Sequence, residues 1–178
     1  MQLQETGFEG LLILQPNIYK DERGSFLESW NHETFKKLNL DISFVQDNQS
    51  VSRKNVLRGL HFQKEPHAQG KLVRVTQGSA LDVVVDLRKQ SDTFGKHFKL
   101  KLSSEQGNML WIPAGFAHGF VALEDHTVFQ YKCDGLYQPK SEDCVIWNDP
   151  SLSIDWGVEN PIISPKDLQG KLLKNLKL

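Results

Sequence analysis

Short apolar segments with a period of two residues run through most of this 178-residue chain. In the segment 81–87, the side chains of Leu81, Val83 and Val85 share one face, because successive residues of a strand point to opposite faces. Turn-forming residues separate the segments, and many short strands of this kind favour an antiparallel sandwich or barrel. The segments expected to form strands are 11–18, 25–30, 44–50, 56–63, 71–76, 81–87, 98–102, 108–112, 119–123, 127–132 and 145–147.

Helical periodicity is weak in this sequence. We expect a short helix capped by Asn31, with Phe35 and Leu38 on its inner face, because asparagine readily accepts hydrogen bonds from the first backbone N–H groups of a helix. A second helix is expected over 166–176. No repeat, linker or shift in composition divides the chain. The sequence therefore predicts a single all-β domain over 1–178 with a few short peripheral helices.

The charges are balanced, with 21 basic and 22 acidic side chains and a formal net charge of −1. Nucleic-acid binding driven by electrostatics needs a basic surface, so a nucleic-acid partner is not expected. No apolar run approaches the roughly 20 residues that span a bilayer, and the first residues lack the pattern of a secretory signal. The 2 cysteines cannot form a disulfide framework. These features favour a soluble protein of a reducing compartment, which we expect to be cytoplasmic.

Two of the 6 histidines, His61 and His118, lie in apolar, strand-like segments beside glycines. Apolar burial lowers the pKa of a histidine and a neighbouring carboxylate raises it, so such positions can hold a base near neutral pH. A structural histidine bonded to a backbone carbonyl is the alternative. Metal-binding barrels of the cupin type carry His-x-His in one strand, but Gln63 and Phe120 follow these histidines at that spacing. A metal site would need His61, His118 and a carboxylate distant in sequence.

Motifs for nucleophilic catalysis and phosphate-binding loops (GxSxG, GxxxxGK[ST], GxGxxG) are absent. The polar residues on the expected strands are instead His, Lys, Tyr, Arg, Gln and Asp. This set of side chains suits proton transfer and anion binding better than nucleophilic or metal chemistry.

Several longer stretches occur in an order that spans nearly the whole chain. They are DERGSFLESW (21–30), FVQDNQSVS (44–52), VLRGLHFQ (56–63), GKLVRV (70–75), LDVVVDLRKQSDTFG (81–95), WIPAGFAHGF (111–120), YKCDGLYQP (131–139), VIWNDPSL (145–152) and ISPKDLQG (163–170). Together they resemble the dTDP-4-dehydrorhamnose 3,5-epimerase family. The resemblance implies a cupin-like β-sandwich or jelly-roll barrel that works as a homodimer without metal or cofactor. The implied activity inverts C3 and C5 of dTDP-4-keto-6-deoxy-D-glucose, which gives dTDP-4-keto-L-rhamnose for deoxysugar biosynthesis.

The resemblance also implies the catalytic residues. C3 and C5 flank the C4 ketone, so an epimerase needs a base on one face of the sugar and an acid on the other. By resemblance, His61 is the base and Asp167 orients it, with Asp82 as an alternative partner. Tyr131 is the implied proton donor, and Lys71 is implied to stabilise the enolate oxygen by its positive charge.

Substrate contacts follow from the same resemblance. Arg23 and Arg58 are expected to bind the diphosphate, because a guanidinium matches paired oxygens. In a regular strand, however, Arg58 and His61 point to opposite faces. Either Gly59 introduces a bulge or Arg58 serves a neighbouring subunit. The other expected contacts are an apolar one from Phe26, a sugar or base contact from Tyr137, and polar ones from Glu28, Gln46, Asn48 and His118.

The sequence departs from the family pattern at Leu136, where many members have a second aromatic residue beside Tyr137, and at Gly157, where proline is frequent. Related enzymes epimerise C5 alone or move a ketone between C3 and C4. The His61, Lys71, Tyr131 and Asp167 set favours epimerisation. A 5-epimerase acting on a related sugar and a non-catalytic nucleotide-sugar binder are the alternative hypotheses.

Overall fold

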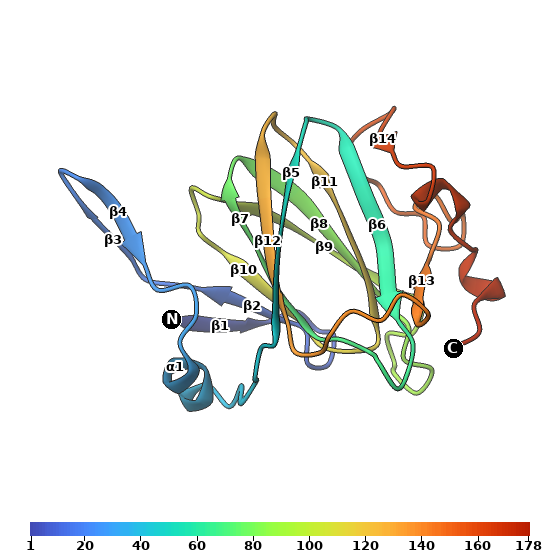
Figure 1. Ribbon diagram of the computed structural model, residues 1–178, viewed down its shortest axis with the longest axis horizontal. Coiled ribbons are helices and arrows are strands. Elements are labelled where there is room, and N and C mark those ends of the chain that lie inside the picture. Colours follow the sequence, from blue (N-terminus) through green and yellow to red (C-terminus); the bar gives the residue numbers. More distant parts are fainter.

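The computed structural model describes residues 1–178, and most of its regular structure is antiparallel sheet. One six-stranded sheet pairs its strands in the order β1, β2, β10, β7, β12, β5. The second sheet has the order β13, β6, β11, β8, β9, and a short strand, β14, runs parallel to β6. Figure 1 shows the two sheets facing each other in a sandwich, as the sequence predicted.

The bounds of the strands follow. The first sheet consists of β1 (Gln2–Glu5), β2 (Leu12–Gln15), β10 (Met109–Ile112), β7 (Lys71–Gln77), β12 (Thr127–Cys133) and β5 (Gln46–Ser52). The second consists of β13 (Glu142–Cys144), β6 (Val56–Gln63), β11 (Phe116–Ala122), β8 (Ser79–Asp86), β9 (His97–Ser103) and β14 (Ile162–Ile163). A separate hairpin consists of β3 (Ile18–Asp21) and β4 (Gly24–Leu27).

Most of the expected strands form, and β6 has the predicted bounds. The strand expected over 145–147 is wrong, because the strand that pairs with β6 is Glu142–Cys144 and ends before Val145. Val145 exchanges backbone hydrogen bonds with Leu60 and forms an isolated bridge to Lys171. Strand β1 was not expected. It lies at the edge of its sheet, and its mostly polar, exposed residues do not show the apolar alternation on which the prediction relied.

The short helix forms as α1 (His32–Lys37), and Asn31 caps it by accepting hydrogen bonds from the backbone of Glu33 and Thr34. The continuous helix expected over 166–176 is wrong. Two 3-10 turns, η1 (Asp167–Gln169) and η2 (Leu173–Asn175), are separated by the extended Gly170. A Cβ on Gly170 would lie 2.8 Å from the backbone of Ile146, so the chain here packs against 145–146 instead of coiling.

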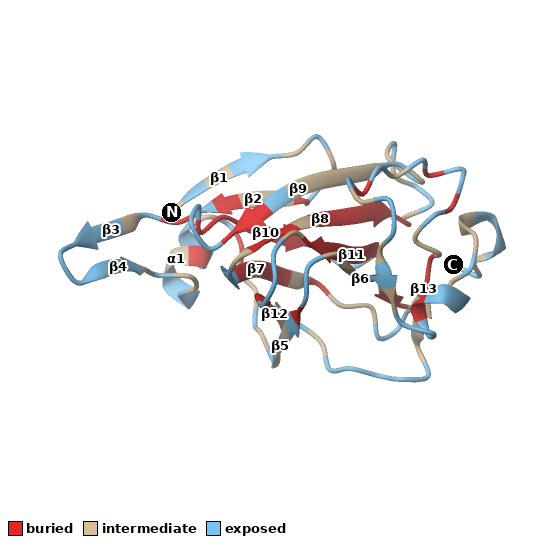
Figure 2. Ribbon diagram, turned by 90° about the horizontal axis from the view of Figure 1, so that it is seen from above, coloured by how far each residue is buried: buried red, intermediate tan, exposed pale blue.

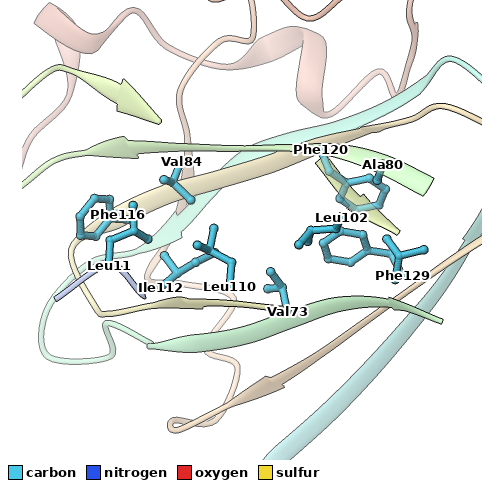
Figure 3. Close-up of a cluster of buried hydrophobic side chains, with 11 residues drawn as sticks. Leu11, Val73, Ala80, Val84, Leu102, Leu110, Ile112, Phe116, Phe120 and Phe129 are labelled. Carbon is cyan, nitrogen blue, oxygen red and sulfur yellow. The ribbon is translucent and has the colours of Figure 1, made fainter. Parts of the chain in front are cut away.

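Three apolar clusters fill the sandwich and cover its outer faces. The cluster between the sheets draws Phe129 from β12, Phe116 and Phe120 from β11, and aliphatic side chains from their neighbours (Figure 3). The rings of Phe120 and Phe129 stack at 4.0 Å between centroids. The C-terminal segment, with Leu152 and Trp156, covers the outer face of the second sheet. Helix α1 covers the first sheet through Phe35. Strand β8 is consequently buried on both faces (Figure 2).

The β3–β4 hairpin projects away from the sandwich (Figure 1) and is exposed along its length (Figure 2). Tyr19 and Phe26 face each other across the hairpin, with 63% and 68% of their surface exposed. The structure contains no helix with the length and apolar composition needed to cross a membrane.

Candidate active site

A cavity of about 680 Å³ opens between the edge of the first sheet and the middle of the second. Strands β5, β7 and β12 line one side, and β6, β11 and the C-terminal segment line the other. The lining residues are Gln46, Asn48, Gln49, Ser50, Val56, Leu57, Arg58, His61, Lys71, His118, Gly119, Phe120, Tyr131, Tyr137, Glu142, Ile162, Ile163, Ser164, Lys166 and Asp167.

His61 reaches the cavity because its neighbours in β6, Leu60 and Phe62, pack into the apolar cluster on the opposite face. Its Nε2 lies 2.9 Å from Oδ1 of Asp167, while Oδ2 of Asp167 accepts a hydrogen bond from the backbone N–H of Gly59. Burial raises the pKa of Asp167, but the hydrogen bonds and the positive charge of His61 outweigh it and leave the pKa below its ordinary value. An ionised Asp167 that accepts Nε2–H leaves Nδ1 of His61 as the basic nitrogen.

Tyr131 and Lys71 approach the cavity from the first sheet, on the neighbouring strands β12 and β7. Burial raises the pKa of Tyr131, so its phenol keeps its proton. Burial lowers the pKa of Lys71, an effect that the negative charges of Asp82 and Glu142 partly oppose. The Nζ of Lys71 lies 5.9 Å from the ring centroid of Tyr131. The cavity therefore has a base, His61, on the second sheet and two proton donors, Lys71 and Tyr131, on the first.

His118 lies beside His61 on the adjacent strand β11. Its Nε2 is 2.7 Å from Oδ1 of Asp82, and both side chains are almost fully buried. Asp82 was one of two candidate partners for His61. The structure instead pairs Asp167 with His61 and Asp82 with His118, because Asp82 lies on β8 and β11 separates β8 from β6.

Arg58 lines the same cavity as His61. In the register of the two strands, His118 pairs with His61 and Phe120 pairs with Arg58. The paired positions are three residues apart in β6 but two residues apart in β11, so β6 contains one extra residue. This bulge at Gly59 turns both side chains to one face. Arg58 can therefore serve the site of its own chain, where its Nε donates to Ser52 Oγ at 3.2 Å.

Gln46, Asn48 and Tyr137 also line the cavity, as the resemblance implied. Sequence reasoning missed Glu142 and Lys166 as site residues. The Nζ of Lys166 and the hydroxyl of Tyr137 both donate hydrogen bonds to Glu142 Oε2, which contributes to a pKa of Glu142 below its ordinary value despite burial. Lys166 directly precedes Asp167 in the ISPKDLQG stretch, and that adjacency was the available signal.

Three of the expected contacts do not reach this cavity. Arg23 and Phe26 lie on the projecting hairpin, where Arg23 forms an exposed ion pair with Asp21. Glu28 accepts hydrogen bonds from Asn31 and Thr34 at the start of α1. These three residues do not line the cavity of their own chain, since the hairpin extends away from the sandwich (Figure 1).

The fold and the cavity define a cupin-like protein with a pocket arranged for general acid–base chemistry. The chain belongs to the dTDP-4-dehydrorhamnose 3,5-epimerase family, whose model matches residues 5–175. The fold and the family predicted from the sequence are thus confirmed.

Named relatives support the same assignment over nearly full length. The dTDP-4-dehydrorhamnose 3,5-epimerase of Shigella flexneri is 48% identical over 172 residues, covering 96% of this chain and 95% of the relative. The crystal structure of the Elizabethkingia anophelis enzyme of that name matches with a TM-score of 0.93 and 46% identity, covering 98% and 97% of the two chains. The Legionella pneumophila dTDP-6-deoxy-D-glucose-3,5-epimerase, in complex with dTDP-4-keto-L-rhamnose, matches with a TM-score of 0.94 and 44% identity, covering 99% and 94%.

Proposed function

We propose that this protein is a cofactor-independent epimerase that inverts C3 and C5 of dTDP-4-keto-6-deoxy-D-glucose, giving dTDP-4-keto-L-rhamnose for deoxysugar synthesis. The observation that carries the proposal is the placement of the His61–Asp167 pair and Tyr131 on opposite sheets around one cavity. Inversion at carbon needs a proton acceptor on one face of the substrate and a proton donor on the other.

In the proposed mechanism, His61 removes the proton from the carbon beside the C4 ketone, and the C–H electron pair moves into the enolate. Asp167 holds the imidazole and stabilises the imidazolium that forms. Lys71, whose Nζ makes no hydrogen bond within the protein, donates to the enolate oxygen as negative charge develops there. Tyr131 then delivers a proton to the opposite face of the same carbon. His61 then releases its proton to water and Tyr131 regains one from water, after which the same steps invert the second carbon.

The diphosphate of the substrate calls for cations at the mouth of the cavity. Arg58 and Lys166 are the candidates in this chain, since their side chains are exposed and line the opening. Gln46, Asn48 and His118 are proposed to hydrogen-bond the sugar, and Tyr137 to contact the sugar or the base.

We also propose a cytoplasmic homodimer with one domain per subunit, in which the β3–β4 hairpin of each subunit reaches the cavity of the other. An isolated two-stranded hairpin has little stability in water, and this one exposes Tyr19 and Phe26. A second subunit would cover those rings and bring in Arg23, Phe26 and Glu28 as substrate contacts. The free, buried cysteines, Cys133 and Cys144, suit a reducing compartment.

The experiment that tests the activity is proton NMR of the purified protein with dTDP-4-keto-6-deoxy-D-glucose in D2O. Loss of signal at both C3 and C5, with formation of the L-rhamno product, is the expected result. Loss at C5 alone would assign a 5-epimerase. Binding without exchange at either carbon would assign a nucleotide-sugar binder, and His61→Ala is the control that removes the base.

A further inference from the structure

The loop between β12 and β13, residues 134–141, carries Tyr137 to the mouth of the cavity without an apolar anchor. Leu136 and Tyr137 are 62% and 44% exposed, and no residue of the loop is buried. Loops without buried side chains generally move more than the elements they connect. Hydrogen bonds must therefore hold this loop in place.

Besides the bonds from Tyr137 to Glu142 and from the Gly70 N–H to Asp134, glutamine side chains hydrogen-bond four consecutive residues of the loop. Gln69 Nε2 donates to the carbonyl of Gly135. The backbone N–H of Tyr137 donates to Gln46 Oε1 at 3.0 Å. The backbone N–H of Gln138 donates to Gln63 Oε1 at 2.6 Å, and Gln63 Nε2 donates to the carbonyl of Leu136 at 3.4 Å.

Gln63 is the central member of this set. Its side chain is 8% exposed, and its Nε2 also donates to the carbonyl of His67 at 2.8 Å. One amide thus joins the 134–141 loop to the turn that follows β6. Gln63 lies two residues after His61 in the same strand, so both side chains leave β6 on one face. The loop that carries Tyr137 is thereby fixed relative to the strand that carries the base.

We propose that Gln63 is a positioning residue for nucleotide binding: it holds the 134–141 loop so that the ring of Tyr137 contacts the base of the bound dTDP moiety. This inference rests on the proposed function, since it assumes that a nucleoside diphosphate occupies the cavity. The reaction centre is separate, because His61 is oriented by Asp167 and not by Gln63.

Hydrogen exchange of the free protein tests the structural half of the inference. Gln63→Ala is expected to raise amide exchange in a peptide covering 134–141, because the N–H group of Gln138 loses its acceptor and the carbonyl of Leu136 loses its donor. Gln15→Ala is the matched control, because it removes a glutamine-to-carbonyl hydrogen bond to Gln106 in another part of the fold. Equal exchange of the 134–141 peptide in the two variants would overturn the inference.

A double-mutant cycle on dTDP affinity tests the functional half. Tyr137→Ala and Gln63→Ala are each expected to weaken dTDP binding by about tenfold, the scale of a lost base–aromatic stack. The double variant should bind no more weakly than Tyr137→Ala alone, since the two residues act through one ring. Additive losses, or unchanged affinity in Gln63→Ala, would overturn the role of Gln63. Gln63→Met keeps the side-chain length and provides the same test if the alanine variant unfolds.

The kinetic constants separate this role from a general loss of stability. Gln63→Ala should raise KM for the dTDP-sugar and leave kcat at saturation close to the wild-type value; a fall in kcat with unchanged KM would contradict it. If the wild-type protein binds dTDP but catalyses no exchange, the proposed activity fails while the binding cycle still decides the role of Gln63. Normal epimerisation together with additive losses in the double-mutant cycle would support the proposed activity and overturn the role of Gln63.

Discussion

Arg58 and His61 face the same cavity although they are three residues apart in one strand. The bulge that permits this places Gly59 against Gly119 of the adjacent strand. A Cβ on Gly119 would lie 2.6 Å from the carbonyl oxygen of Arg58 and 3.0 Å from the Cα of Gly59. The close approach of β6 and β11 therefore depends on the absence of a side chain at both positions.

Gly119→Ala should separate β6 from β11 and displace both Arg58 and His61. Overpacking of this kind costs about 1–3 kcal/mol of unfolding free energy, and we expect a lower Tm together with a lower kcat/KM. Gly157→Ala is the control: it meets open space remote from the cavity but has a φ of +69°, so it should lower Tm and leave kcat/KM unchanged. Full activity of Gly119→Ala would contradict this account of the bulge.

Tyr131→Phe should separate proton removal from inversion. The phenyl ring preserves the packing but cannot deliver a proton to the second face, while the His61–Asp167 pair remains intact. In D2O we expect deuterium to enter the substrate with retention, and product formation to fall by about 100-fold or more. Proton NMR measures both quantities in one sample. Undiminished inversion would show that another group is the donor.

The fall of kcat/KM at alkaline pH should follow the deprotonation of Lys71. The protonated ammonium is the active form, and burial lowers its pKa below the ordinary lysine value of 10.5. Activity should therefore fall, as pH rises, before an ordinary lysine would lose its proton. In Lys71→Arg the charge persists, and because burial raises the pKa of Tyr131 above 10.0, the fall should move to higher pH. The measurement is kcat/KM against pH for both proteins, and a fall at the same pH in both would assign it to a different group.

Asp86 should contribute to stability except in strong acid. Burial raises its pKa, but hydrogen bonds from Arg88, Thr93 and Ser91 lower it to about 2 overall. Relative to an unfolded value near 3.9, that shift corresponds to about 3 kcal/mol, present above the unfolded pKa and lost as pH falls through the folded one. Asp86→Asn should lower the free energy of unfolding at pH 7 by about that amount, measured in urea, and the difference from wild type should shrink towards pH 2. Asp92→Asn, at an exposed position of the same turn, should show little effect.

The period-two pattern was sufficient to predict most strands of the two sheets, because strands buried on one or both faces select apolar residues at a fixed spacing. Segment 56–63 illustrates this, since its bounds agree with β6. The helix expected over 166–176 was a wrong prediction, because there the local spacing of apolar residues did not match the structure. Leu172, Leu173 and Leu176 have a helical spacing, but the chain follows the outer face of a sheet and Gly170 packs against Ile146. Tertiary packing overrode the local periodicity.

The site could be predicted only in part. His61, Lys71 and Tyr131 lie on predicted strands, and each lines the cavity as expected. The pairing of His118 with Asp82 depends on the order of β6, β11 and β8, which the sequence does not specify. Glu142 reaches the cavity because β13 begins earlier than its apolar residues indicate. Arg23 and Phe26 lie on a hairpin whose direction no local pattern encodes.

The carboxylate that orients the base belongs to a different part of the chain from the base itself, 106 positions further on. Every strand of both sheets precedes Asp167. During translation, every strand of both sheets is therefore synthesised before the residue that aligns His61. A chain released before the ISPKD stretch would contain all of these strands up to β13 but would lack the proton-abstracting pair, whatever structure it adopts.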